Sequence, residues 1–588
     1  MTKTYIKGKD EALEVSIEKM QAQLRSLGFD IEEALWLNPV SNIFSVNIRD
    51  KNCPLLFTNG KGSTKNACLA SALGEFFERL NCNYFFADYY LGNDIAQADF
   101  VHYPNEKWFP LDDTIYADLL NKTLWPFYDP DKKLTPELLV DTNSGNAERG
   151  ICALPFVRQR DQKETWFPVN IIGNLYVSNG MSAGNTMTEA RTQALSEVFE
   201  RYVKNRIIAE CLSLPEIPDN IIQMYPKSHA AKTELEQEGF FIEVKDASLG
   251  GQYPVISVTM MEPESGRCLA SFGAHPSFEV ALDRTITELL QGRRLDSLDG
   301  FQTPCFDDEA VADPVNLETH FIDSSGLISY DFFKKEKDFD FVYWDFDNNT
   351  GSEFEFLVNM LEKENKDIYI ADYEHLGVYG CRIIVPGVSE IYPVEELSWQ
   401  NNNEGMILRE RVLSLGDLDA EQAGELLQEL EESDFSDHSD VCGLIGIAPD
   451  PQSVWESLRI GELKAMLALH IGDYEQALDW TQWCLEMEQL SATREKLYRA
   501  ISAMLEIQLD ESRQREMYID AFNALYGEDT IKQCIALIDG QTRYDGLFDA
   551  GMALEGMARH QSLLAAYEKL QGAKREGVGS RAVLFSLD

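Results

Sequence analysis

ALGEFFERL at residues 72–80 and ALSEVFERY at residues 194–202 are two copies of one pattern, and six of their nine positions carry the same residue. In both copies a glycine, Gly62 or Gly184, comes thirteen residues before the first glutamate. An apolar extended stretch precedes each glycine, and the copy itself has the spacing of a helix. The pattern therefore predicts a strand, a glycine turn and a helix, used twice.

A third copy, ALDRTITELLQGR at residues 281–293, is more divergent and keeps the polar positions as Glu288 and Gln291. Apolar stretches at Val255–Met261 and Cys268–Gly273 precede it and have the composition of strands. The strand–turn–helix unit thus occurs three times. We expect an α+β domain that is built around these repeated units.

Each predicted helix has polar residues on one face. At about 3.6 residues per turn, positions i, i+3, i+4 and i+7 lie on the same side of a helix. The residues that share a face in this way on the three helices are Ser71, Glu75, Glu78 and Arg79; Glu197, Glu200 and Arg201; and Arg284, Glu288 and Gln291. If the three helices pack together, five glutamates converge with three arginines beside them.

Such a cluster of carboxylates needs a counter-charge. Two carboxylates about 4 Å apart repel by about 4 kcal/mol even at an effective dielectric constant near 20, so they are protonated, paired or bound to a metal. Oxygen ligands suit Mg²⁺, and guanidinium groups beside it suit the phosphates of a nucleoside triphosphate. A single ExxE pair would mean little, because 99 of 588 residues are acidic, but the repeated context is specific.

Outside the repeated units, the sequence pattern differs from one part of the chain to the next. A first amphipathic helix is expected over residues 11–27, and residues 85–150 read as a loop-rich insertion. GDYEQAL at residues 472–478 fits the small and large positions of a tetratricopeptide (TPR) helix pair, within a region of almost purely helical pattern. We therefore predict a mixed domain over residues 1–403 and an all-α, TPR-like domain over residues 404–588.

The composition and charge of the chain disfavour several classes of function. With 51 basic and 99 acidic residues the net charge is −48, which disfavours general nucleic-acid binding and favours a basic protein partner. There is no run of 18 apolar residues and no signal peptide, and the eleven cysteines form no CxxC pair. A cytoplasmic protein without a membrane span is expected. The P-loop pattern GxxxxGK(S/T) and the zinc pattern HExxH are absent.

The three helix motifs resemble those of the YcaO family. They read SxxxE at Ser71–Glu75, ExxER at Glu197–Arg201 and ExxQ at Glu288–Gln291, in the family's order. The resemblance implies a YcaO-like domain that binds ATP and Mg²⁺ through glutamates on three helices. It also implies that the γ-phosphate of ATP is used to activate a peptide amide oxygen.

By motif, the resemblance also assigns roles to individual residues. Five glutamates would hold magnesium: Glu75, Glu78, Glu197, Glu200 and Glu288. The residues that would contact ATP or orient those glutamates are Ser71, Arg79, Arg201, Arg284 and Gln291, and further candidates for nucleotide contacts are Lys9, Ser16 and Lys61. We place catalysis on Glu78, Glu200 and Arg201.

The resemblance extends to a cellular role. One family member is regarded as an accessory factor for methylthiolation of small-subunit ribosomal protein twelve, together with a radical methylthiotransferase. Two functions stay open: an enzyme that hydrolyses ATP to activate a peptide amide carbonyl by O-phosphorylation, or a nucleotide-binding adaptor whose helical domain recruits the methylthiotransferase. A homodimer is expected. The chain ends in RAVLFSLD, without the PxPxP pattern of azoline-forming members, which argues against azoline synthesis and favours the adaptor.

Overall fold

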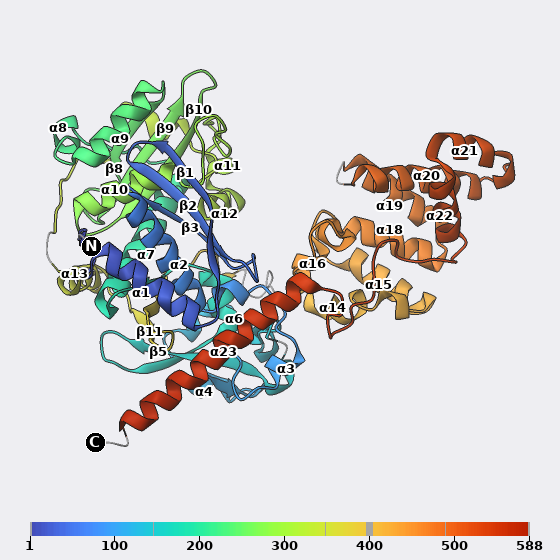
Figure 1. Ribbon diagram of the computed structural model, residues 1–588, viewed down its shortest axis with the longest axis horizontal. Coiled ribbons are helices and arrows are strands. Elements are labelled where there is room, and N and C mark those ends of the chain that lie inside the picture. Colours follow the sequence, from blue (N-terminus) through green and yellow to red (C-terminus); the bar gives the residue numbers. More distant parts are fainter. Residues whose placement is uncertain (1–2, 145, 347–348, 396–403, 488–489, 586–588) are drawn as a thin grey trace.

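The computed structural model describes residues 3–144, 146–346, 349–395, 404–487 and 490–585. Figure 1 shows a mixed part, with β-sheets and helices, and a separate helical part formed by the later chain. The expected α+β fold with an all-α C-terminal region is confirmed. The predicted domain boundary falls at residue 403, outside the described residues, and stays a prediction. Within the described ranges, no helix is both long and apolar enough to cross a membrane.

Strands of the mixed part form three sheets in which all pairings are antiparallel. The described strands are β1 (Ile31–Val40), β2 (Ile43–Asp50), β3 (Phe57–Gly62), β4 (Lys107–Phe109), β5 (Ile151–Arg158), β6 (Glu164–Pro168), β7 (Met181–Gly184), β8 (Phe241–Asp246), β9 (Val255–Glu262), β10 (Arg267–Ala274), β11 (Tyr369–Tyr373) and β12 (Tyr379–Ile384). The sheet orders are β1-β2-β3, β10-β9-β8 and β4-β5-β11-β12-β7, and β6 pairs with β5.

Helices cover these sheets. The longer ones are α1 (Leu13–Ser26), α2 (Lys65–Asn81), α7 (Met187–Ala209), α9 (Pro226–Gln237), α10 (Phe278–Leu289), α12 (Pro314–Ile322) and α13 (Thr350–Lys363). The shorter ones are α3 (Asn93–Ala96), α4 (Ile115–Asp118), α5 (Trp125–Tyr128), α6 (Val169–Ile171), α8 (Asp219–Ile222) and α11 (Asp308–Ala312). The described residues of 85–150 contain only elements of three or four residues.

The sequence repeat is a structural repeat, because β3 leads into α2, β7 into α7 and β10 into α10. In each unit the residue that caps the helix N-terminus stands eleven positions before the first glutamate of the motif. The three pairs are Thr64 and Glu75, Thr186 and Glu197, and Ser277 and Glu288. The glutamate therefore occupies the same turn of each helix.

Gly62 and Gly184 end their strands and are not part of a turn, which corrects the expectation of a glycine turn. A Cβ atom would lie 2.7 Å from Cys68 N at Gly62 and 2.8 Å from Ala190 N at Gly184. No side chain fits at such distances, so only glycine lets the strand end approach the first turn of the next helix this closely.

Apolar residues between the polar positions fix the orientation of these helices. Phe76 and Phe77 on α2 and Phe199 on α7 are fully buried, and so are Leu282 and Ile286 on α10. Each helix thus packs one face into a core, which removes a large apolar area from water. The opposite faces, with the glutamates, are directed into a common space.

The later chain forms helices only, as far as it is described. They are α14 (Met406–Val412), α15 (Ala420–Glu432), α16 (Val441–Leu444), α17 (Val454–Ser457), α18 (Ile460–Ile471), α19 (Tyr474–Glu486), α20 (Ala492–Gln508), α21 (Ile519–Tyr526) and α22 (Glu528–Ile538). Gly472, with φ of 76°, ends α18, and the Asp473 side chain caps α19 by accepting a hydrogen bond from Gln476 N. The helix pair expected at GDYEQAL is therefore present.

The last helix, α23 (Ala558–Phe585), leaves the helical part and lies across the mixed part (Figure 1). Tyr567 OH donates a hydrogen bond to Val101 O at 2.6 Å. Four residues of α23 share one buried core with Phe76 and Phe77 of α2: Leu563, Ala566, Tyr567 and Leu570. The end of the chain thus completes the core beneath the first carboxylate helix.

Candidate functional site

A cavity of about 1030 Å³ opens among α1, β3, α2, α7 and α10. Every residue that the sequence singled out lines it, including those of the N-terminal segment. They are Lys9, Ser16, Lys61, Ser71, Glu75, Glu78, Arg79, Glu197, Glu200, Arg201, Arg284, Glu288 and Gln291. The structure therefore brings together three motifs that are spread over residues 71–291 of the sequence.

On α2, Arg79 is the positively charged partner of Glu75 and Glu78. Its Nη2 atom lies 3.1 Å from Glu75 Oε1, its Nε atom lies 3.8 Å from Glu78 Oε1, and its guanidinium stacks 4.5 Å from the Tyr84 ring centre. Arg79 Nη1 is buried and donates no hydrogen bond. Burial raises the pKa of Glu78 well above its usual range, and the charge of Arg79 only partly offsets this. Ser71 lies exposed two turns before Arg79.

On α7, Arg201 takes the same position relative to Glu197, with Nη2 3.2 Å from Glu197 Oε1. Arg201 Nη1 also donates to Ser178 Oγ at 3.2 Å, and the guanidinium lies 4.6 Å from the Phe321 ring centre. Glu197 Oε1 is buried and accepts no hydrogen bond. Burial raises the pKa of Glu197, as it does for Glu78.

On α10, the charges pair across helices. Arg284 Nη1 donates to Gln193 Oε1 at 2.7 Å, and Arg284 Nη2 lies 3.8 Å from Glu200 Oε2. Glu288 forms an ion pair with Lys61 of β3. Each of these contacts joins two of the repeated units, so the cavity is held together by the residues that line it.

Gln291 was expected to share a helical face with Glu288, and this detail is wrong. α10 ends at Leu289, and Gly292 follows with φ of 73°. Gln291 thus extends from the turn after the helix, where its side-chain amide donates to Asn59 O of β3. It still lines the cavity. Periodicity alone could not locate the helix end, because the motif continues past it.

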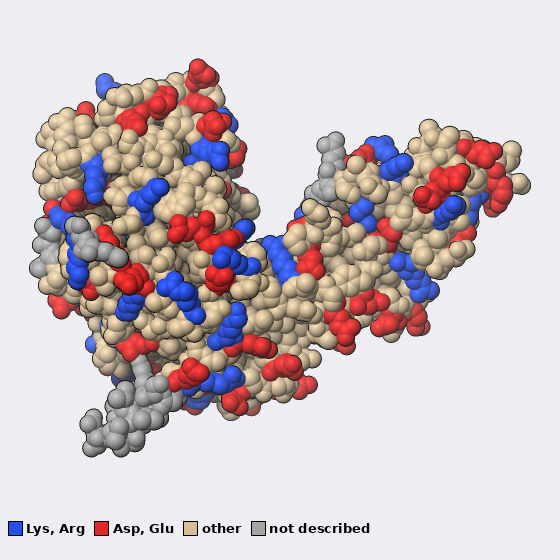
Figure 2. All heavy atoms as spheres, in the orientation of Figure 1, with Lys and Arg blue, Asp and Glu red and all other residues tan. Residues whose placement is uncertain are grey.

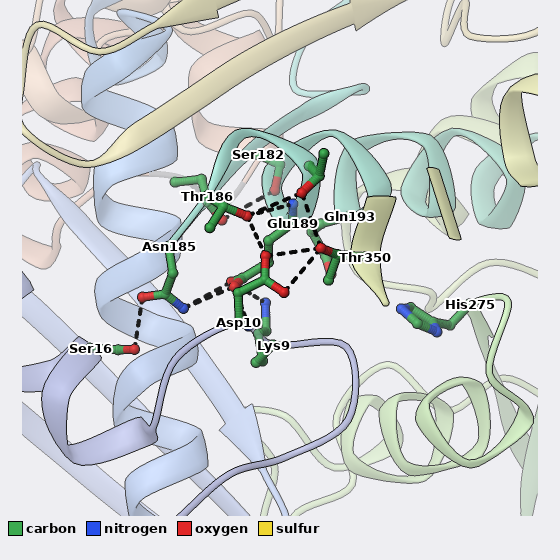
Figure 3. Close-up of polar contacts among 12 residues, drawn as sticks. Lys9, Asp10, Ser16, Ser182, Asn185, Thr186, Glu189, Gln193, His275 and Thr350 are labelled. Carbon is green, nitrogen blue, oxygen red and sulfur yellow. Dashed lines mark hydrogen bonds and ion pairs between the residues drawn. The ribbon is translucent and has the colours of Figure 1, made fainter. Parts of the chain in front are cut away.

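The N-terminal segment closes the cavity against the start of α7 (Figure 3). Lys9 Nζ lies 3.2 Å from Glu189 Oε1, and Ser16 Oγ donates to Asn185 Oδ1 at 2.8 Å. Burial alone would raise the pKa of Glu189, but Lys9 and hydrogen bonds from Asp10 N and Asn185 bring it below the usual range. Lys9 is therefore held at the cavity by Glu189 of α7, and Ser16 by Asn185, which lies just before that helix.

Sequence reasoning missed several polar residues of the cavity. Asn185, Glu189 and Gln193 line it near Lys9, and Lys204 lines it beyond Arg201. Burial lowers the pKa of Lys204 to about 8, and its Nζ atom donates to His320 O at 2.6 Å. Two of these were detectable, because Gln193 and Lys204 share the helical face of Glu197 at i−4 and i+7.

The donor set fits Mg²⁺ and phosphate oxygens. Among the described residues, no three acidic, histidine or cysteine side chains are grouped closely enough to hold a metal, because each glutamate lies against an arginine or a lysine. Yet Glu197 Oε1 and Arg79 Nη1 are buried without hydrogen-bond partners. Buried atoms of both signs that have no hydrogen-bond partner suit a ligand that carries a hard cation and an oxyanion together.

Comparison with known proteins gives two family matches. The model described as "YcaO cyclodehydratase, ATP- and Mg2+-binding" matches residues 59–389, and the "YcaO cyclodehydratase C-terminal domain" matches residues 405–576. The chain is similar over 580 residues to "Ribosomal protein S12 methylthiotransferase accessory factor YcaO" of Escherichia coli (strain K12). Identity is 57%, and the alignment covers 98% of this chain and 99% of the relative.

An "Uncharacterized protein" of Haemophilus influenzae is 53% identical over 580 residues, which cover 97% of this chain and 99% of that protein. Among solved structures, the YcaO from Methanopyrus kandleri bound with AMPPCP and Mg²⁺ is 19% identical. The superposition has a TM-score of 0.42 and covers 65% of this chain and 92% of that one.

Proposed function

The chain belongs to the YcaO family and carries that family's ATP- and Mg²⁺-binding domain, and on that premise we propose that the cavity described above is where ATP and Mg²⁺ bind. One observation supports this placement above all: residues from three separate motifs, together with Lys9 and Ser16, line one cavity of about 1030 Å³. A volume of this size accommodates a nucleotide.

Five glutamates would hold magnesium: Glu75, Glu78, Glu197, Glu200 and Glu288. Burial raises the pKa of Glu78 and of Glu197, so both carboxylates favour a nearby cation. When bound, the metal supplies charge that neutralises the phosphate oxygens. The arginines that now pair with these glutamates would then be available to the phosphates.

The phosphates and the rest of ATP would meet side chains of the same cavity. Guanidinium groups bind phosphate oxygens by two parallel hydrogen bonds, and Arg79 Nη1 is already without a partner. The proposed contacts are Lys9, Ser16, Ser71, Arg79, Arg201, Arg284 and Gln291, with Lys61 as a further candidate.

We propose that a peptide amide oxygen attacks the γ-phosphorus of ATP. The bond between that phosphorus and the β–γ bridging oxygen breaks, ADP leaves, and the amide carbonyl becomes O-phosphorylated. Arg201, which Glu197, Ser178 and Phe321 hold in place, would stabilise charge on the transferred group. Glu78 and Glu200 complete the proposed catalytic set.

In the cell, we propose the role named for the Escherichia coli relative: an accessory factor for methylthiolation of ribosomal protein S12, in the cytoplasm. The alternative is an adaptor that binds a nucleotide and recruits the methylthiotransferase through residues 404–588. The acidity of that part favours a basic partner, because residues 417–440 contain ten acids and no Lys or Arg. A homodimer stays a prediction.

ADP release by the full chain, with and without ribosomal protein S12, separates the two functions. If the chain is an enzyme, it should release ADP in the presence of Mg²⁺, and S12 should raise the rate of release several-fold. The Arg201→Lys variant should show no such rise. The matched control is Arg206→Lys on the same helix, where the arginine pairs with Glu210 outside the cavity. The adaptor is favoured if S12 leaves the rate of ADP release unchanged and the methylthiotransferase co-elutes with the chain. Absence of Mg²⁺-dependent release contradicts the enzyme.

A further inference from the structure

Residues 295–333, which we call the rim, reach the cavity at the end of one helix. The rim contains α11 and α12, and four consecutive residues at the end of α12 line the cavity itself: Phe321, Ile322, Asp323 and Ser324. In the view of Figure 1, α11 and α12 lie at the edge of the mixed part that faces the helical part. The rim is therefore both outer surface and cavity wall.

The rim is acidic along its whole length. It contains no Lys or Arg, and its nine acids are Asp296, Asp299, Asp307, Asp308, Glu309, Asp313, Glu318, Asp323 and Asp331. Lys334 and Lys335 follow it directly, with Lys334 Nζ 3.7 Å from Asp331 Oδ2, and two arginines precede it. One of them, Arg293, is engaged with the rim, since its guanidinium donates to Asp323 O at 2.8 Å and to Asp299 O at 3.4 Å.

Large apolar side chains are exposed on the same segment. Val315 and Ile322 are 69% and 70% exposed, and their spacing of seven residues puts them on one face of α12. Phe306 is 77% exposed, and its ring centre lies 4.7 Å from that of Tyr330. Apolar residues grouped on an outer surface often mark a binding site for another chain.

The inner side of α12 is attached to the proposed catalytic helix. Phe321 lies 4.6 Å from the Arg201 guanidinium, and His320 O accepts a hydrogen bond from Lys204 Nζ at 2.6 Å. Arg201 and Lys204 both belong to α7 and line the cavity. A chain that lies on the outer face of α12 is thus one helix away from the groups that would bind the γ-phosphate.

We propose that the rim is the docking surface for the peptide on which the ATP site acts, and that this peptide is basic with apolar side chains between its cationic ones. The inference rests on the proposed function. Charge decides the occupant, because an acidic surface repels nucleic acid, anionic lipid and the same acidic surface on a second copy of the chain. A basic peptide complements the exposed acids of the rim, and its apolar residues cover Val315 and Ile322.

Fluorescence anisotropy tests this with the full chain and a labelled twelve-residue peptide of alternating Lys and Val. Comparison peptides alternate Glu with Val and Lys with Ser. The rim variants are Val315→Ser/Ile322→Ser and Asp296→Lys/Glu309→Lys. The control, Met517→Ser/Leu525→Ser, removes apolar residues of similar exposure, 76% and 69%, from the helical part. A Glu75→Gln variant shows whether the peptide instead binds the glutamates of the cavity.

We expect the Lys–Val peptide to bind more tightly than both others, and each rim variant to weaken its binding by about tenfold or more. The control and Glu75→Gln should bind as the unchanged chain does. Three results overturn the proposal: no binding by the unchanged chain, equal binding by the rim variants, or loss of binding in the control or in Glu75→Gln. Since nothing in this assay depends on ATP turnover, a failure of the proposed function shows up separately, in ADP release.

Discussion

Lys574, on the last helix, donates a hydrogen bond at 2.5 Å to the Oδ1 atom of Asn83, 491 residues earlier in the chain. The same ammonium group donates to His102 O at 2.7 Å, and no part of the residue is exposed. Burial lowers the pKa of Lys574 well below its usual range. The end of the chain is thus fixed by polar contacts to the segment that directly follows α2.

Replacing Lys574 by Ala should destabilise the mixed part. The change leaves Asn83 Oδ1 buried without a donor, leaves His102 O with only the 3.4 Å hydrogen bond from Asn83 Nδ2, and opens a small cavity, which together cost about 2–4 kcal/mol. Urea unfolding followed by tryptophan fluorescence measures this. The control is Lys569→Ala on the same helix, where a partly exposed lysine donates to Gly28 O at 3.0 Å, and its expected change is within about 0.5 kcal/mol. Equal midpoints for both variants would show that the contact is dispensable.

Arg201→Lys should lower ATP turnover by about tenfold or more, which corresponds to roughly 1.4 kcal/mol of transition-state stabilisation. An ammonium group is a point charge and cannot form two parallel hydrogen bonds to a phosphate while it also contacts Ser178 Oγ. Steady-state ADP release gives kcat and KM for this variant and for Arg206→Lys. If lysine works as well as arginine at position 201, the guanidinium has no role in the reaction.

The buried position of His560 predicts that the free energy of unfolding depends on pH. Its Nδ1 atom accepts from Ala448 N at 3.0 Å and its Nε2 atom contacts Tyr90 O at 2.8 Å, so the neutral ring with a proton on Nε2 satisfies both. Burial lowers the pKa of His560 from 6.5 to about 4. The unfolded chain therefore binds the proton first, and the stability from this group is lost as the pH falls from about 6.5 toward 4.

Between pH 7 and pH 5 this single group should account for about 2 kcal/mol of lost stability. Urea unfolding at both pH values measures the loss in the unchanged chain and in His560→Gln, which cannot take up a proton. Between the two pH values, His560→Gln should lose about 2 kcal/mol less stability than the unchanged chain does. His438, which is exposed, provides the control as His438→Gln. The same loss in His560→Gln and in the unchanged chain would be inconsistent with a buried neutral imidazole.

Much of the site was predictable because its residues are local in sequence and periodic. The helical face of Glu75, Glu78 and Arg79 follows from a period of 3.6, and it recurs in α7. The resemblance to the YcaO family, and ATP and Mg²⁺ as ligands of the domain, are confirmed. The roles assigned to single residues stay predictions.

What could not be predicted depends on contacts between distant segments. Nothing in the sequence of α23 shows that Tyr567 would pack with Phe86, 481 residues earlier, at a ring distance of 4.7 Å. The pairing of Glu288 with Lys61 is likewise a tertiary contact. Gln291 lies past the end of α10 because the chain turns at Gly292. The helical pattern of the sequence continues through this turn and therefore did not indicate it.

Five carboxylates of three helices are proposed to serve one ATP and magnesium site. The most direct measurement is Mg²⁺-dependent ADP release by Glu75→Gln, Glu197→Gln and Glu288→Gln, one from each helix, with circular dichroism to show that each variant is folded. The control is Glu210→Gln, at the end of α7, whose carboxylate pairs with Arg206 as Glu197 does with Arg201. We predict a loss of about 100-fold or more in each of the three, since each removes an oxygen ligand from the same site, and no loss in the control. Turnover at the unchanged rate in all three folded variants would contradict the account.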